Sequence, residues 1–274
     1  MFRFFLLFLF TLSVSAAADT FLGRDVLVMD GRASQSPAPL VLLLHGGLGS
    51  GAQIGRDTDF AHLSSEFGII VAAPNGINRR WQDGRQGPER SDVDYLSALI
   101  EDFVARGLAD PSRVYAIGHS NGGGMAMRMA CDRPDLIAGI GVVATKVIAA
   151  FPCSNGLPMP AIFFHGTEDS IAPHSGRPAG ARLGETLSSD QTAALWAERN
   201  GCTEWASVRR IDARPRDGTA LLVESYLGCS AMLTRIVIEE GGHGWPGSGR
   251  GSMFGGRITR EIDAGRASLR FLLH

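Results

Sequence analysis

One serine lies between two glycines in the stretch Gly118-His119-Ser120-Asn121-Gly122, directly after an apolar run and directly before a helix-like segment. Glycines at these positions let a strand and a helix approach each other closely, so that the serine projects from a sharp turn. A serine hydroxyl becomes a nucleophile only when a base lies within hydrogen-bonding reach and a third group orients that base. The spacing therefore predicts Ser120 as a nucleophile and requires a base and an acid elsewhere in the chain.

The best candidate for the base is His243, in the stretch EEGGHGWPG that follows the last apolar run. The glycine-rich loop can bend to bring the imidazole over the serine. His45 and His165 each come directly after an apolar run, where a structural hydrogen bond is the favoured interpretation. The other histidines occupy positions less suited to a base: His62, His119, His174 and His274.

The acid is expected between the nucleophile and the base, because this kind of turn is followed in chain order by acid and then base. The stretch FFHGTEDSIAP offers Glu168 and Asp169 just past an apolar run. Asp169 is the predicted acid, which would hold the tautomer of His243 and stabilise the imidazolium formed during attack. Glu168 is the neighbouring alternative, and an Asp169 that only caps the loop is the other.

A tetrahedral intermediate also needs hydrogen-bond donors placed where its oxyanion forms. One predicted donor is the backbone N–H of Asn121, at the start of the helix after the nucleophile. The second is expected from the stretch HGGLGSG, from Gly47 or Leu48. That glycine run could alternatively cradle a phosphate, but it lacks the Gly-Lys-Ser/Thr ending of such loops.

Short apolar runs that alternate with helical patterns must position these residues, and they predict an α/β fold with a mostly parallel central sheet and helices on both faces. A helix with Ser91 and Asp94 as its capping box and Gly107 as its stop is expected, and a weaker one follows later. The predicted buried strands are residues 39–47, 68–76, 113–120, 137–144, 160–166 and 234–242, with an edge strand at 23–31 and the helices at 91–107 and 189–201.

The first 18 residues differ in kind from the rest. A lone Arg3 precedes an apolar run from Phe4 to Val14, and small residues end at Ala18. This pattern predicts a signal peptide over residues 1–18 and a single catalytic domain over residues 19–274, exported to the periplasm or secreted. The apolar run is about half the length that a membrane span needs. No cysteine stands at the cleavage point, so no membrane anchor is expected after cleavage.

The chain has 26 Lys and Arg against 28 Asp and Glu, a formal net charge of −2. This balance does not favour nucleic acid as a partner. No Cys-x-x-Cys spacing is present, which argues against a zinc site, and no cofactor is implied.

Export makes disulfides the favoured state of the four cysteines. Three connectivities are possible. Nearest-neighbour pairing of Cys131 with Cys153 and of Cys202 with Cys229 would close two loops of ~25 residues, each worth about 3 kcal/mol in the chain-entropy model. Buried free thiols are the alternative.

The chain resembles the exported esterases grouped as polyhydroxybutyrate depolymerase-like and feruloyl esterase-like proteins of the α/β-hydrolase fold. The resemblance is carried by PLVLLLHGG, VAAPNG, SDVDYLSALI, DPSRVYAIGHSNGGGMAMRMAC, HGTEDSIAP, WAERNGC and GGHGWPG, which together span nearly all of the mature chain. It implies that Ser120, Asp169 and His243 occupy the triad positions. It also implies the two nearest-neighbour disulfides, placed near the substrate face.

The resemblance implies a serine esterase acting on esters of hydroxyacid polymers, of ferulate on plant polysaccharide, or of acetylated sugars. Fold and triad are common to these, so they do not select the substrate. Trp81 and Trp245 could stack on a sugar or an aromatic acyl group, with loop packing as the alternative. A serine peptidase and an inactive binding protein on the same scaffold are the competing hypotheses.

Overall fold

Ten strands form one sheet in the part of the chain that the structure describes, with the order β1-β2-β4-β3-β5-β6-β7-β10-β9-β8. The structure is a computed structural model that describes residues 15–274 apart from residues 35–36, 86, 88, 154–155 and 250–255. Most of the predicted signal peptide, residues 1–14, therefore lies outside the described residues.

The middle of the sheet is built from the six apolar runs that the sequence predicts as buried strands. Neighbours within this set pair in parallel throughout. Strands buried on both faces need side chains that are apolar along most of their length, which is why polar residues in these segments are confined to a few positions, such as 110–113 and 234–235. Their bounds are β3 (Ala38–Leu44), β4 (Ile70–Pro74), β5 (Ala109–His119), β6 (Gly139–Val143), β7 (Ala161–Gly166) and β10 (Leu233–Glu239). The predicted mostly parallel sheet is confirmed.

Antiparallel strands extend the sheet at both edges. At one edge β1 pairs with β2, and β2 pairs with β4. At the other edge β9 pairs with β10, and β8 pairs with β9. The bounds of these strands are β1 (Ser15–Phe21), β2 (Arg24–Asp30), β8 (Glu204–Ile211) and β9 (Ala220–Leu227).

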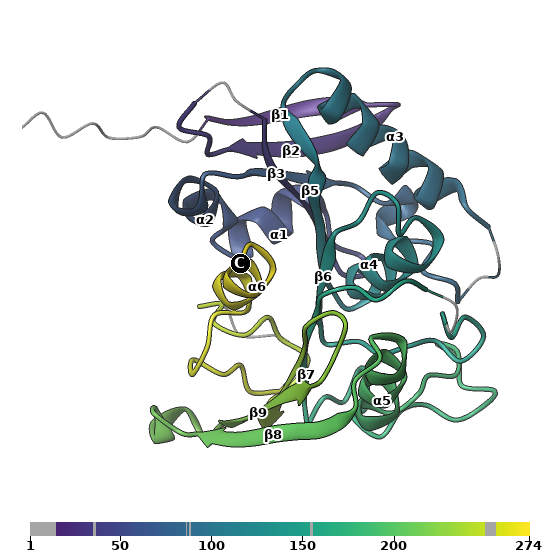
Figure 1. Cartoon of the computed structure of the whole chain (residues 1–274), viewed down its shortest axis with the longest axis vertical. Coiled ribbons are helices and arrows are strands. Elements are labelled where there is room, and N and C mark those ends of the chain that lie inside the picture. The colour runs from purple at the N-terminus through teal and green to yellow at the C-terminus, as the bar shows by residue number, and fades with distance from the viewer. Residues whose placement is uncertain (1–14, 35–36, 86, 88, 154–155, 250–255) are drawn as a thin grey trace, which may run out of the picture.

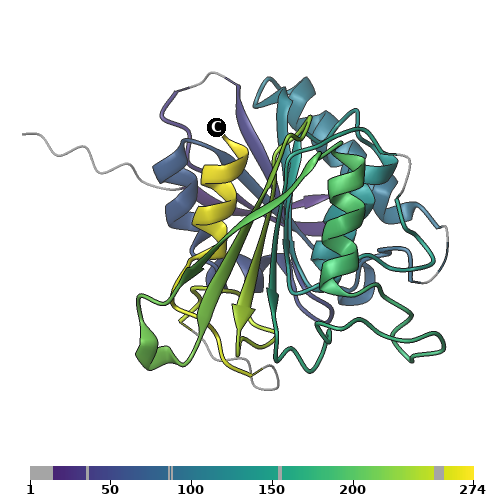
Figure 2. The same ribbon diagram turned by 60° about the horizontal axis from the view of Figure 1, so that its bottom comes forward.

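Helices cover both faces of the sheet. In Figures 1 and 2, α3, α4 and α5 lie on one face, and α1, α2 and α6 lie on the other. The bounds of the helices are α1 (Gly51–Asp57), α2 (Phe60–Phe67), α3 (Ser91–Ala105), α4 (Asn121–Asp132), α5 (Ser189–Arg199) and α6 (Ala264–Leu272).

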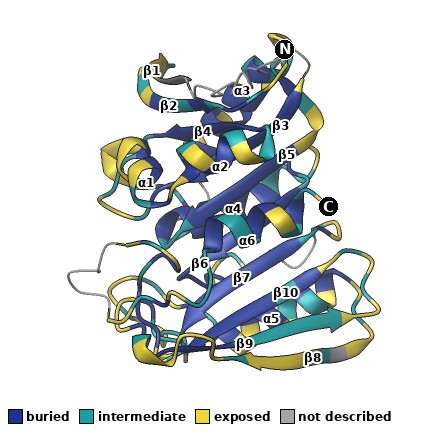
Figure 3. Cartoon of the chain, turned by 90° about the vertical axis from the view of Figure 1, so that its left-hand side faces the viewer, coloured by how far each residue is buried: buried dark blue, intermediate teal, exposed yellow. Residues whose placement is uncertain are grey.

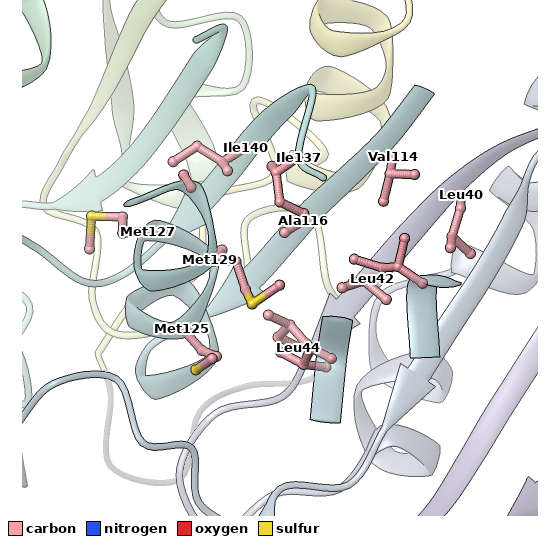
Figure 4. Packing of buried hydrophobic residues seen from close by; sticks show 14 of the residues in the cluster. Leu40, Leu42, Leu44, Val114, Ala116, Met125, Met127, Met129, Ile137 and Ile140 are labelled. Atoms are coloured by element: carbon pink, nitrogen blue, oxygen red, sulfur yellow. The ribbon is translucent and has the colours of Figure 1, made fainter. Parts of the chain in front are cut away.

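Successive residues of β3 serve the two cores in turn. Leu42 and Leu44 face α4, where they join the cluster that contains Met125 and Met129 (Figure 4). Val41 and Leu43 belong to the second cluster, beneath α1, α2 and α6. Since successive side chains of a strand point to opposite faces, one aliphatic strand contributes side chains to both hydrophobic cores. Figure 3 shows the result, in which the parallel strands are buried and β8 is largely exposed.

The start of α3 differs from the prediction. The cap position falls on Arg90, and no side chain caps it. The hydroxyl of Ser91 instead donates to the Gln82 side chain at 2.6 Å. The predicted capping box at Ser91 and Asp94 is therefore wrong, because a tertiary partner takes the hydroxyl. The predicted stop holds, since Gly107 has a φ of 68° and directly follows Arg106, the C-cap residue of the helix.

Two disulfides pair the cysteines that are nearest in the sequence. Cys131 bonds to Cys153, and Cys202 bonds to Cys229. The expectation that the disulfides lie near the substrate face is wrong for Cys202–Cys229. Cys229 lies between β9 and β10, at the end of the sheet where the parallel strands begin. Ser120 lies at the opposite end, because it follows the last residue of β5. Cys131 is at the far end of α4 from Ser120, roughly 16 Å along the helix.

Candidate active site

Ser120 occupies a strained turn between β5 and α4. Its φ is 52° and its ψ is −117°, a backbone conformation that residues other than glycine rarely adopt. The turn is fixed on both sides, because the Ser120 N–H donates to the Val143 carbonyl at 2.7 Å and the Ser120 carbonyl accepts from the Gly124 N–H at 3.0 Å. Strain that the surroundings hold in place is typical of functional positions.

The two glycines of the motif are required by close backbone contacts. A Cβ on Gly118 would stand 2.2 Å from the Gly122 carbonyl oxygen. A Cβ on Gly122 would stand 2.1 Å from the Leu44 carbonyl oxygen, on the neighbouring strand β3. Any side chain at either position would push strand and helix apart. The structure thus gives the glycines the steric role that the sequence predicts.

His243 and Asp169 meet across the carboxyl ends of β10 and β7. The His243 Nδ1–H donates to Asp169 Oδ2 at 2.8 Å, and both side chains are buried. Asp169 Oδ1 accepts from the Ile171 N–H at 3.0 Å and from the Ala172 N–H at 2.7 Å. Glu168, the alternative acid, is exposed one residue earlier. Asp169 is therefore the carboxylate that orients this imidazole.

Electrostatics keep Asp169 ionised. Burial by itself would raise the pKa of Asp169, but the hydrogen bond and charge of His243, with the Ala172 N–H, hold the pKa below its usual value. With Nδ1–H donated to the carboxylate, the neutral imidazole keeps a lone pair on Nε2. That nitrogen can accept a proton from a hydroxyl.

His119, the residue before Ser120, contacts His243. Its Nε2 lies 3.2 Å from the His243 carbonyl oxygen, and the two ring centroids are 5.1 Å apart. Burial lowers the pKa of His119 to about 3, so the ring is neutral and can donate this bond at ordinary pH. The sequence identifies His119 only as the variable residue of the motif, directly before Ser120, and a contact across 124 residues leaves no signal in the spacing.

The predicted oxyanion donors lie around the same turn. Asn121 is the first residue of α4, where backbone N–H groups have no partner inside the helix. The Cβ position of Gly47 is 3.8 Å from the Asn121 Cβ, so the loop after β3 passes beside it. The Leu48 N–H is already donated to the Arg79 carbonyl at 2.7 Å, and the Leu48 side chain is exposed. Of the two loop candidates, the geometry favours Gly47.

Trp81 supports this loop from inside. It is 1% exposed, and its indole N–H donates to the His45 carbonyl at 3.0 Å. The Asn121 side chain accepts from the Trp81 N–H at 2.7 Å and donates to the Trp81 carbonyl at 2.9 Å. The predicted stacking of Trp81 on a substrate is therefore wrong for this structure, because the ring has no free face. The packing alternative holds. His45 also makes the predicted structural hydrogen bond, because its Nε2 accepts from the Gly76 N–H at 3.0 Å.

A cavity of about 490 Å³ opens beside His243. One wall is the loop of residues 46–50, the second is α1 with Gln53 and Ile54, and the third is formed by His243 and Trp245. Trp245 is buried and packs edge-on against Phe60. Unlike Trp81, Trp245 lines a space that a ligand can enter.

The parallel sheet with helices on both faces, and the sharp turn at Ser120 between β5 and α4, are those of an enzyme of the α/β-hydrolase fold. Residues 25–155 match the model of the family described as Esterase PHB depolymerase. The chain is 35% identical over 234 residues to the poly(3-hydroxybutyrate) depolymerase of Ralstonia pickettii. The matched region covers 78% of this chain and 46% of that protein. Over residues 25–155 the chain is therefore similar to the Esterase PHB depolymerase family.

Two further similarities agree with this. The chain is 28% identical over 233 residues to feruloyl esterase B of Piromyces equi, covering 80% of this chain and 42% of that protein. The structure superposes on the acetyl xylan esterase from Aspergillus awamori with a TM-score of 0.62 at 16% identity, over 94% of this chain and 98% of that one. This chain thus spans less than half the length of the Ralstonia and Piromyces proteins.

Proposed function

We propose that this chain is an exported serine esterase that hydrolyses short hydroxyacid polyesters or their oligomers. The observation that carries the proposal is the 2.8 Å bond between His243 Nδ1 and Asp169, formed beside a serine held at a φ of 52°. The family supports the reaction class, and the Ralstonia relative supports the hydroxyacid ester. A feruloyl or acetyl-xylan ester is the alternative substrate, supported by the Piromyces relative.

The reaction begins with attack of Ser120 Oγ on the ester carbonyl, as His243 Nε2 takes the hydroxyl proton. The carboxylate of Asp169 stabilises the imidazolium. The oxyanion accepts hydrogen bonds from the N–H groups of Asn121 and Gly47. His243 then gives the proton to the leaving alcohol, and an acyl group remains on Ser120. Water activated by His243 releases the acid and restores the enzyme.

The cavity beside His243 is the proposed site for the part of the ester next to the reacting carbonyl. Its walls combine an apolar ring, Trp245, with polar groups from α1 such as Gln53. That mixture suits a short chain with ester oxygens along an aliphatic backbone.

Export agrees with two disulfides, which persist in oxidising compartments. Within the described residues, none of the helices has the length and apolar character to cross a membrane. We expect a signal peptide over residues 1–18 to be removed. The mature chain would then keep only Asp19–Phe21 of β1 paired with β2.

The test is a substrate panel run on wild type and Ser120→Ala: p-nitrophenyl acyl esters, methyl ferulate, acetylated xylan, hydroxybutyrate oligomers and a peptide amide. Ser112→Ala is the matched control, because Ser112 is exposed and bonds only to Asp110. We expect hydroxybutyrate oligomers to be cleaved fastest, with Ser120→Ala inactive and Ser112→Ala unchanged. Preference for methyl ferulate or acetylated xylan would select the alternative, and equal activity of wild type and Ser120→Ala would disprove the mechanism.

A further inference from the structure

Lys146 is the single lysine of the chain, and the structure buries it. It follows β6 by three residues and is 1% exposed. Its Nζ donates to the carbonyl oxygens of Ala172 at 2.9 Å and Pro173 at 2.7 Å. Both acceptors belong to the turn that leaves the end of β7 and carries Asp169. Lys146 therefore ties the segment after β6 to the turn of the proposed catalytic acid.

The backbone of Ala172 links Lys146 to Asp169 through two neighbouring peptide groups. The Ala172 N–H donates to Asp169 Oδ1 at 2.7 Å. The Ala172 carbonyl, in the next peptide group, is hydrogen-bonded to Lys146 Nζ and to His165 Nε2, the latter at 2.8 Å. Asp169 Oδ2 accepts from His243 Nδ1. Lys146 is thus connected to Asp169 and His243 through hydrogen bonds and the intervening Ala172 backbone.

The charge on Lys146 is not balanced by a contacting carboxylate. Among the described residues its ammonium takes part in no ion pair within 4 Å, and its hydrogen-bond partners are neutral carbonyls. Burial lowers the pKa of Lys146 to about 8, with further lowering from Arg177 and Arg85 and an opposing effect from Asp169. The charge of Lys146 in turn contributes to the lowered pKa values of His165 and His174.

A buried cation with only carbonyl partners is a costly way to close a turn, since an apolar side chain would avoid the desolvation. Its position on the turn of Asp169 suggests what the cost achieves. We propose that Lys146 is a positioning residue for the proposed triad: by holding the Ala172 and Pro173 carbonyls, it keeps the Asp169 carboxylate aimed at His243. The inference depends on the triad assigned under the proposed function.

A double-mutant cycle tests the inference. Lys146→Met removes the donors and the charge while keeping an unbranched side chain. In the wild-type background we expect kcat for p-nitrophenyl acetate to fall ~10–100-fold with KM changed less than about twofold, because a small misplacement of a catalytic group is enough for such a loss. In the Asp169→Asn background the same substitution should lower kcat by less than about twofold, since residues that act as a unit are not additive.

Arg199→Met is the matched control. Arg199 is also a buried cation that donates to backbone carbonyls, at 2.8 Å to Leu157 and 2.9 Å to Ala130, but no described contact joins it to the triad. It should leave kcat within about twofold in both backgrounds. If Lys146→Met lowers kcat by the same factor in the wild-type and Asp169→Asn backgrounds, its effect does not pass through Asp169 and the inference is overturned. An unchanged kcat in the wild-type background overturns it as well.

The two hypotheses fail differently. If Asp169→Asn alone leaves turnover intact, the triad is wrong and the inference falls with it. If Asp169→Asn abolishes turnover but Lys146→Met does not reduce it, only the inference falls. Should Lys146→Met not fold, Lys146→Gln supplies the same cycle with a neutral donor in place. In that variant kcat should again drop, because the shorter side chain does not reach both carbonyls; unreduced kcat overturns the inference.

Discussion

The carbonyl oxygen of Leu44 lies 2.1 Å from the place where a Cβ on Gly122 would stand. Strand β3 and helix α4 thus touch backbone to backbone directly beside Ser120.

Gly122→Ala should therefore destabilise the protein by about 3 kcal/mol or more and abolish turnover, because overpacking at this contact displaces the nucleophile turn. Urea unfolding and kcat measured on the same preparation check this. Gly249→Ala is the control, since among the described residues no atom beyond its chain neighbours lies within 4 Å of a Cβ there. A stable, active Gly122→Ala variant would contradict the role given to this glycine.

Asp169→Asn should reduce kcat by ~10⁴-fold with little change in KM, since the amide favours the wrong imidazole tautomer. Glu168→Gln is the neighbouring control and should leave kcat within about twofold, because Glu168 is exposed. Steady-state kinetics on a soluble ester measure both. If the effects were reversed, Glu168 would be the acid.

Removing the Asn121 side chain should weaken both the loop and the fold. In Asn121→Ala the Trp81 N–H and carbonyl lose their partners. A buried group left without a partner costs about 1–3 kcal/mol, so we expect a drop in the free energy of unfolding of roughly 2 kcal/mol. Guanidinium unfolding monitored by tryptophan fluorescence gives this difference in free energy. A change below about 0.5 kcal/mol would speak against a stabilising role for the two Asn121–Trp81 hydrogen bonds.

The depressed pKa of Lys146 predicts a pH-dependent contribution to stability. Below pH 8 this lysine is protonated in both states, so folding bears the cost of burying the charge. Between about pH 8 and 10.5 the folded state has released the proton and the unfolded state has not, so the free energy of unfolding rises with pH. Urea unfolding at pH 7 and pH 9.5 should show this gain in wild type relative to Lys146→Met. An equal pH response in both proteins would refute it.

The disulfide between Cys202 and Cys229 should affect stability but not catalysis. Replacing both with serine should lower the free energy of unfolding by about 3 kcal/mol. We expect kcat at 25 °C to stay within about twofold of the wild-type value, because the disulfide lies at the end of the sheet opposite Ser120. Thermal unfolding and kinetics of the double variant measure the two effects, and a large loss of kcat would place the disulfide in the site.

The sequence was sufficient for the parallel strands, because segments such as β3 are aliphatic throughout and bounded by glycine or proline. It was insufficient for β8, whose largely exposed and polar residues show no apolar run. Edge strands depend on a neighbour for their hydrogen bonds, and the sequence does not name that neighbour. The capping error at Ser91 has the same origin, since its partner Gln82 comes from another segment.

The proposed triad could be predicted because chain order and loop glycines restrict the candidates to a few residues. Its supporting residues could not. The sequence around Lys146 contains no pattern that predicts its contact with Ala172. Trp81 lies in a predicted loop, and only the folded structure shows that its ring is buried. These roles arise from contacts between distant segments.

Burial of the only lysine also has a practical consequence. Amine-reactive reagents normally label proteins at many surface lysines, but here Lys146 is 1% exposed in the folded chain. Such reagents therefore find no exposed lysine side chain in the folded protein. A lysine introduced at one exposed position would then be the single accessible lysine side chain for an aldehyde or activated-ester resin, which would favour an immobilised layer of uniform orientation.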